Sequence, residues 1–130
     1  MPETNVELAE RGYRALNEGD LEAFLSIVHP EVEFGSLVAE AEGGEYSGHD
    51  GVRAWWESVL QAMGGLHFEL QETRDFGDQM VAKLRVTGHV GGVEIPQTMW
   101  QTIRVRDGRP VWWQTFRTEA EAMRAVGQPG

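Results

Sequence analysis

The chain has 130 residues, no cysteine, and 21 acidic against 11 basic side chains, which gives a formal net charge of −10. A chain of this length forms one domain with a full hydrophobic core. The negative charge argues against nucleic acid or an anionic membrane surface as a partner. The lack of cysteine excludes disulfides and thiolate chemistry. Neither a membrane span nor a signal peptide is recognisable, so we expect a single soluble, cytoplasmic domain over residues 1–130.

Two helices are expected near the start of the chain. Residues 4–7 have the Thr-x-x-Glu pattern of a capping box, and Gly19 ends the helix that they open. Asp20 caps a second helix, which His29-Pro30 stops, and a short strand over residues 32–36 and a loop over 37–47 follow. The inner face of the first helix is predicted to carry Val6, Ala9, Tyr13 and Leu16.

A third helix is expected from residue 48, and it is unusually rich in tryptophan. Its apolar side chains recur on a 3.6-residue period, which makes a broad stripe along one face. Such a helix can cover a curved sheet and leave an aromatic cavity beneath it. The stripe consists of Val52, Trp55, Trp56, Val59, Leu60 and Met63.

The second half of the chain alternates apolar and polar residues, as half-buried strands do. Strands are predicted from residues 66, 80, 93 and 111, with turns over 76–78 and 88–92 and a two-residue hairpin at Asp107-Gly108. A second capping box over residues 118–121 opens a short helix that Gly127 closes. Helices followed by a bent antiparallel meander predict an α+β fold.

Four short motifs then suggest a relationship. They are Asn-Glu-Gly-Asp-Leu-Glu-Ala at 17–23, Tyr-Ser-Gly-His-Asp-Gly-Val at 46–52, Arg-Asp-Gly-Arg at 106–109 and Glu-Ala-Glu-Ala at 119–122. With these motifs the chain resembles a SnoaL-like member of the nuclear transport factor 2-like, or ketosteroid isomerase-like, superfamily. The resemblance implies a cone-shaped curved sheet, antiparallel or mixed, that encloses a pocket with three helices. Because this superfamily contains enzymes, binding domains and assembly domains, the resemblance does not choose a function.

The same resemblance raises the question of whether the chain could isomerise steroids. Aligned with ketosteroid isomerase, the base carboxylate of that enzyme falls on Ser36 and its protonated acid falls on Gln101, while its tyrosine falls on or beside Gly12, next to Tyr13. A serine does not replace the carboxylate base, and an amide donates only a neutral hydrogen bond. This departure argues against steroid isomerisation.

Strand alternation predicts which side chains face the cavity. If Phe34 points inward, Ser36 does too, and on later strands Gln101 shares its face with Thr115. The expected ligand-binding residues are Tyr13, Phe34, Ser36, Trp56, Met99, Gln101, Trp113, Thr115 and Arg117. Among these, the candidates for a catalytic role are Gln101, Tyr13, Arg117 and Ser36. For Tyr13 and Trp56 plain core packing is the alternative, and for Arg117 it is a salt bridge with Glu119 or Glu121.

No metal and no organic cofactor are expected. The four histidines lack metal-ligand spacing, and no glycine-rich phosphate loop lies between a strand and a helix. His49 remains of interest because it lies in a family-like motif at the start of a helix. The opposite face of the sheet should carry Trp100, Trp112 and Phe116, an apolar patch that predicts a homodimer through that face.

Three functions follow as hypotheses. The first is a cofactor-independent lyase, isomerase or cyclase that acts on an apolar polyketide- or terpenoid-like substrate. The second is a non-catalytic binder of a small hydrophobic ligand. The third is a dimeric assembly domain whose cavity is filled by its own side chains.

Overall fold

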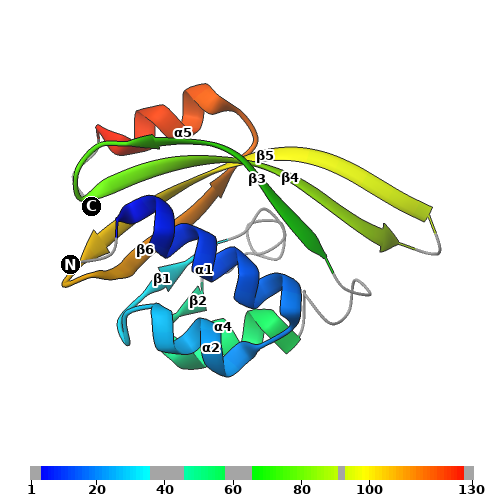
Figure 1. Ribbon diagram of the computed structural model, residues 1–130, viewed down its shortest axis with the longest axis horizontal. Helices are drawn as coiled ribbons and strands as arrows, with labels where there is room; N and C mark the ends of the chain where they lie inside the picture. The colour runs from blue at the N-terminus through cyan, green and yellow to red at the C-terminus, as the bar shows by residue number, and fades with distance from the viewer. Residues whose placement is uncertain (1–3, 36–45, 58–65, 91–92, 128–130) are drawn as a thin grey trace.

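The computed structural model describes residues 4–35, 46–57, 66–90 and 93–127. Four helices and six strands lie in these ranges, and three of the helices gather on one side of the sheet while the fourth lies on the other side (Figure 1). This arrangement confirms the predicted α+β class. In chain order the elements are α1 (Asn5–Glu18), α2 (Leu21–Ile27), β1 (Glu33–Phe34), β2 (Tyr46–Ser47), α4 (Gly48–Trp55), β3 (His67–Asp75), β4 (Gln79–Val90), β5 (Val93–Arg106), β6 (Arg109–Phe116) and α5 (Glu119–Val126).

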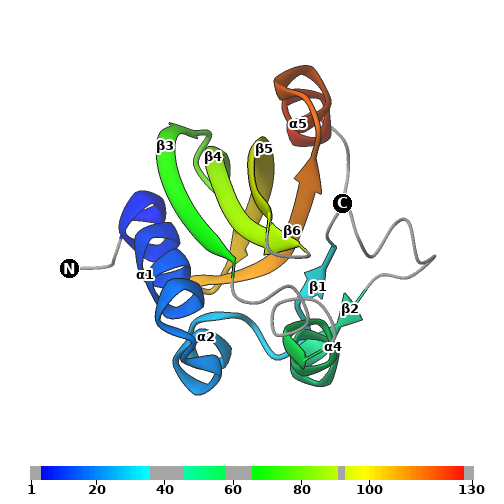
Figure 2. The ribbon, with the colours of Figure 1, turned by 90° about the vertical axis from the view of Figure 1, so that its right-hand side faces the viewer.

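The six strands form one mixed, open sheet in the order β2-β1-β6-β5-β4-β3. Among the described strands only β1 and β6 pair in parallel. Figure 2 shows the long strands β3 to β6 curving around the side that holds α1, α2 and α4. We call this side the concave face and the side that carries α5 the outer face. None of the helices in the described ranges is long and apolar enough to cross a membrane.

The turns between the strands follow the predicted chemistry with one correction. Asp107 and Gly108 both have positive φ, 56° and 74°, as a two-residue hairpin requires. The turn predicted over residues 88–92 is shorter than expected, because β4 and β5 stay paired through Gly88↔Ile95 as far as Val90↔Val93. Gly88 therefore does not end the pairing of β4 with β5, because its backbone still takes part in that pairing.

Helix α1 is fixed at both of its ends. Thr4 and Glu7 form the predicted capping box, with the Thr4 hydroxyl accepting from the Glu7 backbone N–H at 3.1 Å. Near the other end, Asn17 donates from Nδ2 to the Phe68 carbonyl at 2.8 Å and accepts from the Phe68 N–H at 2.7 Å. These bonds satisfy the backbone N–H and carbonyl of Phe68 on the free side of β3, which is an edge strand. Tyr13 lies four residues before Asn17 and therefore on the same face of α1. The Asn17 bonds thus also hold Tyr13 over the concave face.

An aromatic core lies between the sheet and the helices. Phe34 lies 4.7 Å from Trp55 between ring centroids, and Trp113 lies 5.5 Å from Phe24 and 5.6 Å from Tyr13, the latter edge to face. Aromatic pairs at such separations are stabilising beyond the area that they bury. The predicted stripe of the tryptophan helix is buried at Val52, Trp55 and Trp56, and the rest of that stripe lies outside the described residues.

Helix α5 covers part of the outer face. The Thr102 hydroxyl donates to the Ala122 carbonyl at 2.8 Å, and Arg104 donates from Nη2 to the Ala125 carbonyl at 2.9 Å. The Arg104 guanidinium also lies 4.2 Å from the centre of the Trp112 ring, which is a cation–π contact. The aromatic residues predicted for this face are therefore partly covered within one chain.

Candidate functional site

Gln101 lies at the centre of a buried hydrogen-bond cluster on the concave face. Its Oε1 accepts from the Tyr13 hydroxyl at 2.6 Å and from Trp113 Nε1 at 2.7 Å. Its Nε2 donates to the Thr115 hydroxyl at 3.0 Å, and that hydroxyl donates to the Gly35 carbonyl at 3.2 Å. We call the side chains of Tyr13, Gln101, Trp113 and Thr115 the Gln101 cluster.

Strand register explains why these side chains meet. Gln101 pairs directly with Thr115, and Ile103 pairs with Trp113, so the three polar side chains stand on one face of two neighbouring strands. A bulge between Arg104 and Val105 comes after this region and leaves the predicted alternation intact through Ile103. The sequence prediction that Gln101 faces the helices is confirmed by its contact with Tyr13 of α1.

The Gln101 cluster is electrically neutral. Its four side chains are each 5% exposed or less. Burial raises the pKa of the Tyr13 hydroxyl far above its ordinary value of 10.0, because the phenolate would lose its hydration. Tyr13 is therefore a neutral phenol at physiological pH and does not serve as a base there. Among the described residues the buried polar side chains are Gln101, Thr102, Gln114 and Thr115, without a carboxylate. The cluster can orient a polar group by neutral hydrogen bonds.

The remaining predicted site residues are placed as follows. Phe34 and Trp56 are buried in the aromatic core, with Phe34 6.0 Å from Trp113. Met99 lies two residues before Gln101 and is partly buried. Ser36 lies outside the described residues.

Arg117 differs from its prediction. It is exposed and follows Phe116, the last residue of β6, so it does not join the Gln101 cluster. The alternative, a salt bridge with Glu119 or Glu121, is not found among the described residues, where Glu119 pairs with Arg74 at 3.1 Å. Strand alternation predicts an inward Arg117, but β6 ends one residue earlier. The site proposed below leaves Arg117 out.

Two aromatic neighbours of the cluster were not among the predicted ligand-binding residues. Phe24 lies against Trp113, and Phe68 stacks on Tyr13 with ring centroids 6.4 Å apart. The signal that could have found them is present in the sequence, because Phe24 belongs to the apolar face of α2 and Phe68 to the apolar face of β3. Spacing within one element does not show which elements meet.

His29 and His49 each contact the backbone of a nearby segment. The His49 ring nitrogen Nε2 lies 3.2 Å from the Val28 carbonyl, which joins the start of α4 to the end of α2. His29 Nδ1 accepts from the Glu31 N–H at 3.0 Å, and His67 is exposed. No group of three or more potential metal ligands is found in the part of the chain that the structure describes. The expectation of no metal and no cofactor stays a prediction.

A comparison with protein families decides the relationship of this chain. The model of the SnoaL-like domain family matches residues 9–113, which is most of the sequence and includes all of the Gln101 cluster except Thr115. The chain belongs to the SnoaL-like domain family. The predicted relationship is thereby confirmed. A search of curated proteins finds no match.

Solved structures confirm the nuclear transport factor 2-like fold of this SnoaL-like domain. TerC, co-crystallised with polyporic acid, has 21% identity and a TM-score of 0.80, over 95% of this chain and 98% of TerC. A protein of unknown function from Burkholderia pseudomallei, itself nuclear transport factor 2-like, has 24% identity and a TM-score of 0.76, over 95% and 98% of the two chains. A candidate polyketide cyclase from Sinorhizobium meliloti has 20% identity and a TM-score of 0.71, over 84% and 93%.

Proposed function

We propose that this SnoaL-like domain binds a small, largely apolar molecule on its concave face, against the Gln101 cluster. The observation that carries the proposal is the combination of a neutral hydrogen-bonding cluster with a wall of aromatic rings. Ligand sites are commonly apolar surfaces with a few fixed polar groups that set orientation. The co-crystallisation of TerC with polyporic acid supports a ligand of this class.

The ligand would approach the cluster past Met99. This side chain lies on the same face as Gln101, packs against the core and remains partly exposed, so it marks a point where the apolar interior meets solvent. Leu66 and Leu70 are also partly exposed hydrophobic neighbours of this core.

A charge placed at Met99 should weaken ligand binding by about tenfold or more, because an ionised carboxylate in an apolar site is costly to desolvate. The variant is Met99→Glu, and the matched control is Thr98→Glu, which adds the same charge to the exposed neighbour on the opposite face. Dissociation constants for deoxybenzoin, an aromatic ketone, and for polyporic acid would be measured by titration calorimetry. Failure of both compounds to bind, or equal weakening in the two variants, would contradict the proposal.

A second candidate function is catalysis, as a cofactor-independent lyase, isomerase or cyclase acting on a polyketide- or terpenoid-like substrate. The fold shared with a candidate polyketide cyclase favours it. Because Tyr13 is held neutral and donates its proton to Gln101, it would position a substrate and would not remove a proton. An enolising catalyst would accelerate exchange of the acidic methylene protons of deoxybenzoin with deuterium from solvent, whereas a binder would leave the exchange at the rate in buffer.

We also propose that the domain is a homodimer that associates through its outer face. Trp100 and Phe116 pair across β5 and β6, and Trp112 lies 6.5 Å from Phe116 between ring centroids. All three are partly buried in one chain and keep some exposed surface beside α5. An apolar patch next to charges of both signs is suited to a twofold contact, which must be complementary to itself.

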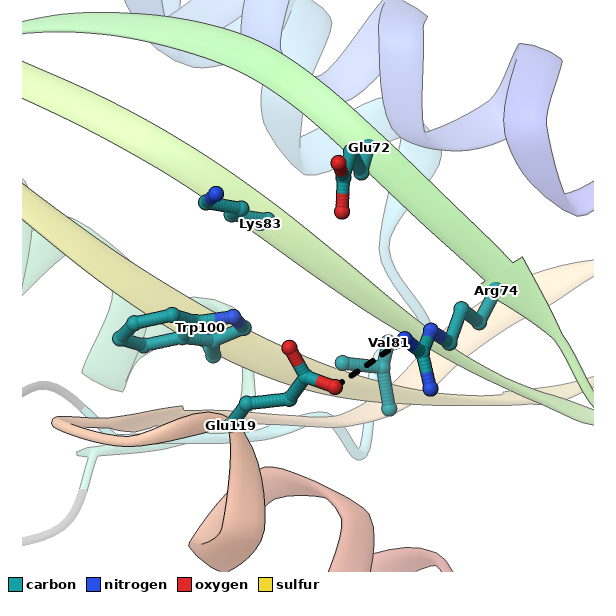
Figure 3. A pocket seen from close by; sticks show the side chains of 6 residues that line it. All are labelled: Glu72, Arg74, Val81, Lys83, Trp100 and Glu119. Atoms are coloured by element: carbon teal, nitrogen blue, oxygen red, sulfur yellow. Dashed lines mark ion pairs between the residues drawn. The ribbon is translucent and has the colours of Figure 1, made fainter.

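Charged residues flank this patch at a small hollow. Figure 3 shows Trp100 beside Lys83, with Glu72 on the next strand and the Arg74–Glu119 ion pair, at 3.1 Å, on the other side of the hollow. The cavity volume is only about 10 Å³, which is room for about one water molecule. The hollow is therefore too small for the proposed ligand, and its paired charges fit the rim of a protein contact better.

Trp112→Glu should convert a dimer into a monomer, because two like charges would face each other near the twofold axis. The fold should survive, since the new carboxylate would lie beside the Arg104 guanidinium. Sedimentation equilibrium should give about twice 14.6 kDa for the wild type and 14.6 kDa for the variant. Phe76→Glu is the matched control, because Phe76 is 40% exposed and lies outside the patch. A wild-type protein that sediments as a monomer would refute the dimer.

A further inference from the structure

The hydrogen bonds of the Gln101 cluster fix the orientation of the Gln101 amide. The indole nitrogen of Trp113 can only donate a hydrogen bond, so the Gln101 atom 2.7 Å from it must be the oxygen. The Tyr13 hydroxyl, 2.6 Å from the same oxygen, must also donate. The amide nitrogen therefore points to Thr115, and the reversed orientation would set two donors against each other.

The Gln101 cluster keeps hydrogen-bond donors and acceptors that its internal bonds do not use. Gln101 Oε1 accepts two bonds and is saturated. Tyr13 has used its single proton and keeps a free lone pair. Thr115 has given its proton to the Gly35 carbonyl. Gln101 Nε2 has two N–H groups and, within the described part of the chain, uses one of them, so one donor remains. The unused capacity includes one donor on Gln101 and one acceptor on Tyr13.

The free N–H of Gln101 and the free lone pair of Tyr13 are close together, because the Tyr13 hydroxyl is hydrogen-bonded to the same amide group. The Tyr13 oxygen lies 2.6 Å from one end of the Gln101 amide, and Nε2 is the other end of the same amide. A ligand that meets both must therefore carry its own acceptor and donor on neighbouring or nearly neighbouring carbons. The polarity is fixed as well, with Tyr13 accepting and Gln101 donating.

Resting on the function proposed above, we infer that the ligand is a hydroxyketone or an enolised diketone. Its carbonyl oxygen accepts from Gln101 Nε2, and its hydroxyl donates to the Tyr13 oxygen. Tyr13 thus acts toward the ligand as an acceptor and does not polarise the carbonyl. Buried polar groups discriminate strongly against a ligand that leaves them unpaired.

Three neutral, similarly shaped compounds test this inference. Benzoin carries a ketone and a hydroxyl on adjacent carbons, deoxybenzoin has only the ketone, and 1,2-diphenylethanol has only the hydroxyl. We expect the wild type to bind benzoin about 3- to 10-fold more tightly than either of the others, the effect of one added hydrogen bond. Affinities would be measured by quenching of tryptophan fluorescence.

Two variants assign the contacts. Tyr13→Phe should remove the preference for benzoin over deoxybenzoin and leave the affinity for deoxybenzoin within about twofold, because only the hydroxyl contact is lost. Gln101→Glu should weaken both ketones and spare 1,2-diphenylethanol, because the amide donor is replaced by an acceptor. Equal binding of benzoin and deoxybenzoin by the wild type would overturn the inference, whether or not the variants fold, and leave the proposed function standing. Absence of binding by all three compounds would overturn both.

Discussion

Replacing Gln101 with methionine should lower the free energy of unfolding by about 3–5 kcal/mol. The substitution removes the acceptor of two buried donors, the Tyr13 hydroxyl and the Trp113 indole N–H, which have no other partner among the described residues. Each buried donor left without a partner costs about 1–3 kcal/mol. Methionine keeps the length and flexibility of the side chain, so the loss would come from the hydrogen bonds and not from a cavity. Equilibrium unfolding in urea would measure it.

Gln114→Met is the matched control for this prediction. Gln114 is the same residue type on β6, is also buried, and faces away from the cluster, with its amide against Gly35. Its Nε2 is buried without a hydrogen-bond partner in the described ranges. Removing an unsatisfied amide should therefore change the free energy of unfolding by less than about 1 kcal/mol, or raise it. Equal losses in the two variants would show that the Gln101 cluster contributes no more than ordinary packing.

Alkaline pH should destabilise the wild type more steeply than Tyr13→Phe. In the unfolded chain Tyr13 ionises near its ordinary pKa of 10.0, whereas burial raises its pKa in the folded state. Above about pH 10 the unfolded state therefore binds fewer protons than the folded state, and stability falls as pH rises. The slope due to Tyr13 approaches about 1.4 kcal/mol per pH unit, while the stabilisation is fully present below pH 10.

The comparison isolates one hydroxyl, because every other titrating group is common to both proteins. Free energies of unfolding would be measured from about pH 8 to about pH 11.5. We expect parallel curves below pH 10 and convergence above it, because only the wild type loses the contribution of Tyr13. Curves that stay parallel at all pH values would mean that Tyr13 ionises normally in the folded protein.

Alternation along single strands predicted much of the site, because side-chain direction follows directly from strand geometry. It placed Gln101, Trp113 and Thr115 on one face, and all three are buried there. It did not predict the partner of Gln101, because alternation within one strand does not show which side chain of another element reaches a buried amide. Only the approach of α1 to β5 decides that choice.

The limits of sequence interpretation appear at the ends of elements and between layers. The alternating pattern of β6 continues in the sequence to Arg117 and predicts that this side chain faces the cavity. The strand itself ends at Phe116, so the pattern no longer applies there. The terminal helix was predicted from its capping box, yet nothing in its sequence showed that α5 would bond to Thr102 and Arg104 on the outer face. Such contacts depend on the path of the chain between elements, which local patterns do not encode.

The most direct test of the binding site is to observe which tryptophan senses the ligand. The chain has five tryptophans, and each gives one indole N–H resonance that can be assigned with Trp→Phe variants. Trp113 donates its N–H to Gln101 on the concave face, whereas Trp100 and Trp112 stand on the outer face. During a titration with benzoin followed by nitrogen–proton correlation NMR, the Trp113 resonance should shift progressively while those of Trp100 and Trp112 stay in place. A shift confined to Trp100 or Trp112 would contradict a ligand site at the Gln101 cluster.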